Sequence, residues 1–162
     1  MTKGPGQPAE PIDARGVRVA VVVSRFNPEI TEALLTAARK EFGRLGGEAS
    51  TLTVVHVPGA FELPVVVGRL ARLGRHDAVV ALGCLIRGET VHDRVIADAV
   101  AGSLAAVSVE TGVPIGFGVL TVDTFEQARA RAGGENGNKG ADAIAAAVET
   151  FRTLQRSARE GS

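Results

Sequence analysis

The sequence predicts an α/β protein of three layers, α/β/α, in which a doubly wound parallel sheet of four strands has helices on both faces. Three observations predict this fold class. Short valine-rich apolar runs alternate with longer stretches of helical periodicity, the links between them are short, and no internal repeat is present. Strands that alternate with helices form parallel sheets through right-handed crossovers, and such sheets are buried on both faces.

Two strands and two helices are predicted in the first part of the chain. Residues 17–23 (VRVAVVV) form an apolar run typical of a buried strand. A helix is predicted over residues 27–47, because Asn27 can cap it, a proline suits its first position and two glycines end it. Residues 51–57 (TLTVVHV) are predicted as the second strand. Residues 61–74 carry apolar side chains at helical spacing, which predicts the second helix.

The remaining elements continue this alternation. Residues 77–86 (DAVVALGCLI) predict the third strand, and residues 91–112 predict a long helix with apolar residues near one side. Residues 113–122 (VPIGFGVLTV) predict the fourth strand. A short helix over residues 124–133 and a final helix over residues 139–160 complete the chain.

Length and composition bound the domain organisation. A chain of 162 residues suggests one domain. We place that domain at residues 16–160, after a proline- and glycine-rich arm at residues 1–15 that is either mobile or adds an edge strand to a neighbour's sheet. The single cysteine, Cys84, excludes an internal disulfide framework and a zinc cluster built from cysteines.

Charge and hydropathy exclude several classes of partner. Eighteen basic and eighteen acidic residues leave no net charge, and no basic block predicts binding to nucleic acid or to an anionic membrane. No apolar run reaches the length of a membrane span, and the first residues do not form a secretory signal. The expected location is therefore the cytoplasm.

Ligands of such sheets bind beyond the carboxyl ends of the strands, which directs attention to the loops there. In the first loop, Phe26 either packs on the first helix as a hydrophobic staple or lies over a planar ligand ring. In the second loop, Glu62 either complements the dipole of a helix start or accepts hydrogen bonds from ligand hydroxyl groups. His56, at a strand end, is interpreted as a polar residue without a catalytic role.

The third loop, LGCLIRGETVHDRVI, combines a helix start with a histidine. Free N–H groups at a helix N-terminus bind phosphate, and Glu89 and Thr90 directly precede the predicted helix. His92 lies in its first turn, where the positive helix end favours a neutral imidazole suited to proton transfer. The alternative is an ordinary polar surface residue.

The segment RARAGGENGNKGAD carries two further cations. It does not have the order of a phosphate-binding Walker loop, because lysine precedes glycine and a helix precedes the segment. Arg131 and Lys139 are therefore either solvated side chains around a flexible link or contacts to an anion.

Five segments in this order resemble one family. They are RFNPEIT, VPGAFELP, ALGCLIRGETVH, GVPIGFGVLTVDTFEQARARAG and GNKGADAI. Together they are similar to 6,7-dimethyl-8-ribityllumazine synthases of riboflavin biosynthesis, over roughly residues 15–152. The resemblance implies a flavodoxin-like strand order and a transferase. Such an enzyme condenses 5-amino-6-(D-ribitylamino)uracil with L-3,4-dihydroxy-2-butanone 4-phosphate, giving the lumazine, phosphate and water, with neither cofactor nor metal.

The resemblance also implies roles for individual residues. His92 matches the proton donor and acceptor, Phe26 the ring that stacks on the pyrimidine, and Arg131 the phosphate-binding arginine. Phe117 matches a residue given by the adjacent subunit, and Lys139 a lysine near the site. The other implied substrate contacts are Ala60, Phe61 and Glu62 for the ribitylaminouracil, backbone groups of Cys84, Leu85 and Ile86 for the pyrimidine edge, and Glu89 and Thr90 for phosphate.

The segment after the histidine departs from the family pattern. Asp93 and Arg94 follow His92, where an aromatic and then an acidic residue are expected. Asp93 can orient the imidazole, and Arg94 can pair with Asp93 or with Glu89. Either change would alter substrate handling, so a family member of changed specificity stays open as an alternative.

The resemblance finally implies an assembly. Family members form homopentamers with the active site at the subunit interface, and some pack twelve pentamers into an icosahedral shell of 60 subunits. The short link GGENGNKG favours the shell. The alternatives are a non-catalytic flavin- or lumazine-binding module, a purely shell-forming paralogue, and a signalling receiver domain, which would need acidic residues where Ser24 and Gly83 stand.

Overall fold

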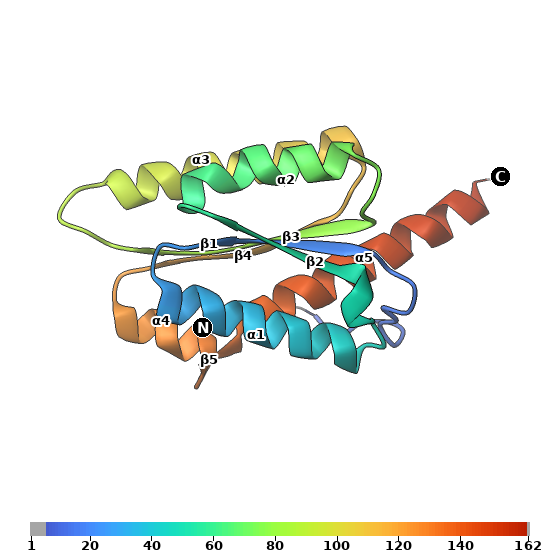
Figure 1. The fold of residues 1–162 in the computed structure, drawn as a ribbon, viewed down its shortest axis with the longest axis horizontal. Helices are drawn as coiled ribbons and strands as arrows, with labels where there is room; N and C mark the ends of the chain where they lie inside the picture. Colours follow the sequence, from blue (N-terminus) through green and yellow to red (C-terminus); the bar gives the residue numbers. More distant parts are fainter. Residues whose placement is uncertain (1–5, 162) are drawn as a thin grey trace.

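The computed structural model describes residues 6–161 and confirms the three-layer fold (Figure 1). Its central sheet has four parallel strands in the order β2-β1-β3-β4. The elements, in chain order, are β1 (Val19–Ser24), α1 (Pro28–Arg44), β2 (Leu52–Val57), α2 (Leu63–Arg72), β3 (Ala78–Ile86), α3 (His92–Thr111), β4 (Ile115–Val122), α4 (Phe125–Arg131), β5 (Ala132–Gly134), β6 (Gly137–Asn138) and α5 (Lys139–Glu160), with short 3-10 turns at Ala49–Thr51 and Ala60–Glu62.

Helices cover both faces of the sheet, because alternate side chains of β1 point to opposite sides. Val21 and its odd-numbered neighbours pack against α1 and α5, whereas Ala20 and Val22 pack against α2 and α3. Figure 1 shows α2 and α3 on one side of the sheet and α1, α4 and α5 on the other. All six residues of β1 are buried, as expected for a central strand.

The start of α1 differs from the sequence-based expectation. Asn27 precedes the helix, but its side chain makes no capping hydrogen bond. Its backbone is left-handed, with φ 58°, and its Nδ2 atom donates to the carbonyl oxygen of Cys84 at 2.9 Å. The capping prediction was wrong because the amide instead ties the loop after β1 to β3.

The link before α5 also differs from the expectation of a flexible connection. Ala132–Gly134 and Gly137–Asn138 form a small antiparallel hairpin. The Asn138 side chain then caps α5, accepting from the N–H of Gly140 at 2.8 Å and of Ala141 at 3.2 Å. Gly140 lies so close to α1 that a Cβ there would collide with the backbone of Leu34.

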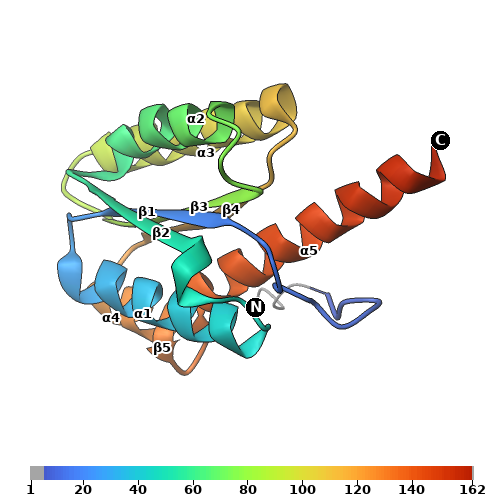
Figure 2. The same cartoon turned by 45° about the vertical axis from the view of Figure 1, so that its right-hand side comes forward.

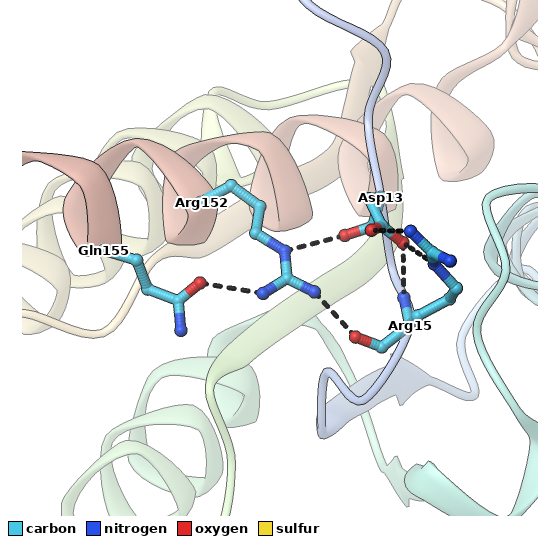
Figure 3. A network of polar contacts seen from close by, with 4 residues as sticks. All are labelled: Asp13, Arg15, Arg152 and Gln155. Carbon is cyan, nitrogen blue, oxygen red and sulfur yellow. Dashed lines mark hydrogen bonds and ion pairs between the residues drawn. The ribbon is translucent and has the colours of Figure 1, made fainter.

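Arg152 of α5 holds the segment that leads into β1 (Figure 3). Its Nε donates to the carbonyl oxygen of Asp13 at 2.9 Å, its Nη2 to that of Arg15 at 2.6 Å, and its Nη1 to the side chain of Gln155 at 2.8 Å. No strand occurs within residues 6–18. Beyond Arg152, the C-terminal part of α5 extends past the sheet (Figure 2).

Within residues 6–161, every helix is either too short or too polar to span a lipid bilayer.

Candidate active site

Two adjoining cavities lie at the carboxyl ends of β1, β3 and β4. The larger, of about 670 Å³, is called here the apolar cavity, and the smaller, of about 430 Å³, the polar cavity. The apolar cavity is lined by Phe26, Asn27, Gly59, Ala60, Phe61, Glu62, Cys84, Leu85, Ile86, Gly88, Thr90, His92, Asp93, Val95 and Ile96. The polar cavity is lined by Arg87, Gly88, Glu89, Thr90, Val91, Asp93, Arg94, Thr121, Val122, Asp123, Gln127 and Arg131.

Both cavities share Gly88, Thr90 and Asp93, which lie at and before the start of α3. The structure therefore places an apolar space beside a charged one, with the N-terminus of a 20-residue helix between them. A flat apolar ring and an attached anion can be held next to each other in such an arrangement.

Two phenylalanine rings of the apolar cavity are exposed. Phe26 is 69% and Phe61 63% accessible, although aromatic side chains of this size are usually covered. The staple interpretation of Phe26 is wrong for this chain, because a ring packed on α1 would be covered. The exposed rings are available for contact with a planar ligand or with another protein surface.

The left-handed conformation of Asn27 turns the chain between β1 and α1, next to Phe26. The bond from Asn27 to the Cys84 carbonyl then ties this loop to the end of β3. Cys84 itself is buried, and burial raises the pKa of its thiol to about 11. A pKa raised in this way favours the neutral thiol near pH 7 over the nucleophilic thiolate.

Glu62 ends the 3-10 turn that precedes α2 and is half-buried. Its backbone N–H donates to the carbonyl oxygen of Gly59 at 3.3 Å. A Cβ on Gly59 would lie 3.1 Å from Glu62 Oε2, so glycine leaves space around the carboxylate. The carboxylate faces the apolar cavity, where ligand hydroxyl groups would be its natural donors.

His92 is the first residue of α3 and is solvent-exposed in the chain. Its backbone N–H donates to Thr90 Oγ1 at 3.3 Å, so the threonine hydroxyl closes the turn before the helix. His92 lines the apolar cavity, and the next residue in the chain, Asp93, lines both cavities. A proton carrier at this position can serve a ligand bound in the apolar cavity.

The end of β4 supplies the far wall of the polar cavity. Arg131 lies in the last turn of α4, and its Nη1 donates to the Gln127 carbonyl oxygen at 3.0 Å. The side chain of Gln127 accepts from the N–H of Asp123 at 2.8 Å. Asp123 lies 3.7 Å from Arg87, which directly follows β3. These contacts link β3, β4 and α4 around the cavity.

The structure brings most predicted site residues together, with two exceptions. Phe117 is half-exposed on β4 and lines neither cavity. Lys139 also lines neither cavity, and its Nζ pairs with Asp142 at 3.4 Å in the first turn of α5. Within residues 6–161, Arg94 forms an ion pair with neither Asp93 nor Glu89, the two partners that the sequence offered.

Sequence reasoning missed four polar side chains of the polar cavity, namely Arg87, Thr121, Asp123 and Gln127. Two signals were available, since Arg87 directly follows β3 and Asp123 directly follows β4. Among residues 6–161, no three histidine, cysteine or carboxylate side chains are gathered in a way that would hold a metal ion.

Comparison with known proteins decides the family. The family model described as 6,7-dimethyl-8-ribityllumazine synthase matches residues 16–155. The chain belongs to this family.

Curated relatives of the family agree with this assignment over nearly their whole length. A lumazine synthase of Kineococcus radiotolerans is 51% identical over 154 residues, which are 94% of each chain. One of Thermus thermophilus is 48% identical over 91% of this chain and 94% of the relative. One of Nitratidesulfovibrio vulgaris is 44% identical over 90% of this chain and 93% of the relative. Each carries the name 6,7-dimethyl-8-ribityllumazine synthase.

Proposed function

We propose that this chain catalyses the reaction for which its family is named. It condenses 5-amino-6-(D-ribitylamino)uracil with L-3,4-dihydroxy-2-butanone 4-phosphate to 6,7-dimethyl-8-ribityllumazine, phosphate and water. The observation that carries the proposal is the pair of cavities that meet at the start of α3, one apolar with exposed aromatic rings and one lined by arginines.

The apolar cavity binds the ribitylaminouracil. Phe26 stacks on the pyrimidine, while backbone groups of Cys84, Leu85 and Ile86 at the end of β3 pair with its polar edge. Ala60 and Phe61 contact the substrate from the second loop, and the Glu62 carboxylate accepts hydrogen bonds from ribityl hydroxyl groups. The support is that all of these residues line one cavity of about 670 Å³.

The polar cavity binds the phosphate of the ketone. Glu89 and Thr90 present backbone N–H groups before α3, where the helix dipole favours an anion. The Arg131 guanidinium approaches from α4 and can donate two parallel hydrogen bonds to phosphate oxygens. The substrate carbonyl then lies at the boundary between the cavities, next to the amine of the uracil.

His92 moves the protons of the reaction. The uracil amine attacks the ketone carbonyl, and loss of water gives an imine. Phosphate then leaves, the carbon chain isomerises, and the second nitrogen closes the ring with loss of water. Holding the two substrates together removes an entropic barrier of up to about 7–11 kcal/mol, whereas one positioned histidine adds about 10²–10⁴-fold. Positioning is therefore the larger contribution.

The site is completed by a second copy of the chain. Phe117 lies outside both cavities, and other large apolar side chains are exposed on α2 and α3, among them Val65, Val95 and Val109. Covering them by association would be favourable. We propose a homopentamer with Phe117 entering the neighbour's crevice, Lys139 near it, and twelve pentamers forming a shell.

Two parts of the proposal come from the sequence. Residues 16–160 form the catalytic domain and residues 1–15 the arm, whose first five residues lie outside the described part of the chain. A cytoplasmic location stays a prediction.

The deciding experiment mixes both substrates with the protein and follows phosphate release together with the absorbance of the lumazine. Equal amounts of both products are expected. A protein that binds the lumazine but releases no phosphate would support the non-catalytic alternative. Light scattering on the same sample distinguishes a pentamer from a shell of 60 subunits.

A further inference from the structure

The polar cavity contains more cations than the phosphate site of the proposed function uses. Arg87, Arg94 and Arg131 line it, together with the carboxylates of Glu89, Asp93 and Asp123. The formal charges cancel, so the cavity as a whole does not attract an anion by net charge. A phosphate can be held only where a guanidinium is available for it.

Two of the three guanidinium groups already have partners in the protein. Arg87 lies 3.7 Å from Asp123, and Arg131 donates through Nη1 to the Gln127 carbonyl oxygen at 3.0 Å. Within residues 6–161, Arg94 has neither an ion pair nor a hydrogen bond from its side chain. Of the three arginines, it is the one whose guanidinium group makes no polar contact with another described residue.

The position of Arg94 lowers the stability of α3. It is the third residue of α3, and a positive side chain in the first helical turn opposes the helix dipole. Removing it would leave three carboxylates against two arginines around the cavity. The guanidinium therefore offsets the negative charge of Glu89 and Asp93 at the point where the phosphate would bind.

We propose that Arg94 is a second phosphate-binding arginine, which selects the phosphorylated ketone and completes the anion site together with Arg131. This inference rests on the proposed function. The phosphate lies between the two guanidinium groups, one from the start of α3 and one from the end of α4. Two arginines match a phosphate dianion in charge, and each can donate a pair of hydrogen bonds.

The test compares R94Q and R94K with the wild type, with R39Q as the charge-matched control. Arg39 is exposed on α1 and lines neither cavity. R94Q is expected to raise the KM for the ketone phosphate about tenfold, or about 1.4 kcal/mol, with the KM for the uracil changed less than twofold. Inhibition by inorganic phosphate should weaken by the same factor. R94K should recover part of both losses, and R39Q should show neither.

Sizing and circular dichroism of each variant separate binding from assembly. If R94Q forms the wild-type particle and keeps its KM for the ketone phosphate and its phosphate inhibition within twofold, the proposal is refuted. Equal increases of both KM values, accompanied by a smaller particle, would instead assign Arg94 to a contact between copies and also refute it. A wild type that makes no lumazine would overturn the proposed function itself, which is a separate outcome.

Discussion

The side-chain amide of Asn27 donates a 2.9 Å hydrogen bond to the carbonyl oxygen of Cys84, 57 positions later in the chain. The bond joins the loop after β1 to the end of β3, and both segments line the apolar cavity. The backbone of Asn27 is left-handed, with φ 58°. One residue thus combines the turn next to Phe26 with a contact between two segments that line the cavity.

Substitution of Asn27 should separate the contribution of its side-chain hydrogen bond from that of its left-handed backbone conformation. Asn27→Gly loses the hydrogen bond but permits positive φ, and should lower the free energy of unfolding by about 1 kcal/mol. Asn27→Ala also strains the backbone and should cost about 1–2 kcal/mol more. Urea unfolding at one protein concentration measures both. Equal losses in the two variants would show that backbone strain is absent.

Replacement of His92 should slow the reaction without abolishing it. His92→Ala is expected to lower kcat about 10²-fold while leaving both KM values nearly unchanged, because proton transfer is one contribution among several. Steady-state lumazine formation measures it. His56→Ala is the control, since His56 lies on β2, pairs with Glu32 at 2.8 Å and lines neither cavity. Complete inactivity of a correctly assembled His92→Ala protein would contradict the dominance of positioning.

Removal of Arg131 should affect the two substrates unequally. Arg131→Ala is expected to raise the KM for the ketone phosphate about tenfold or more, because a charge-assisted contact worth about 1.5–3 kcal/mol is lost. The KM for the uracil should change little. Arg129→Ala is the matched control on the same helix, where Arg129 pairs with Glu29 at 2.9 Å. Equal weakening of both substrates would refute the phosphate assignment.

His76 should make stability depend on pH. Burial, and next the positive charge of Arg18, lowers the pKa of His76 below its usual value. Its Nδ1 is buried without a hydrogen-bond partner among the described residues. The unfolded chain therefore binds a proton more readily than the folded one, and the free energy of unfolding should fall as pH drops through the unfolded pKa of about 6.5.

The measurement compares urea unfolding of the wild type and His76→Gln at about one pH unit above and below that value. The variant should lose less stability between the two conditions than the wild type. Identical losses would show that other groups cause the dependence.

The sequence was sufficient for the fold because its periodicity is strong. Predicted strands and helices agree with the structure apart from a few terminal residues. The hairpin at Ala132–Asn138 was missed because its strands have two and three residues and are mostly glycine, so no alternating apolar pattern marks them. The conformation of Asn27 depends on a carbonyl group of a distant strand, which local propensities do not contain.

The site was predictable where its residues are marked by local sequence signals, and not where their role depends on the tertiary structure. Residues within the loops that follow β1 to β3 were identified, because each loop carries its own signal. Arg87 and Asp123 have functional meaning only once the ends of β3 and β4 are adjacent, and a charged residue just after a strand is ordinary in sequence. The roles of Phe117 and Lys139 stay predictions, since one chain does not bring them to either cavity.

The burial of Cys84 has a practical consequence for experiments on the assembly. It is the single cysteine of the chain, and its raised pKa makes it a poor target for thiol reagents near neutral pH. A cysteine introduced at an exposed position such as Val109 would then be the preferred target of a maleimide dye. Fluorescence from such a label would report whether position 109 becomes covered by a neighbouring copy, with no need to mutate the native thiol.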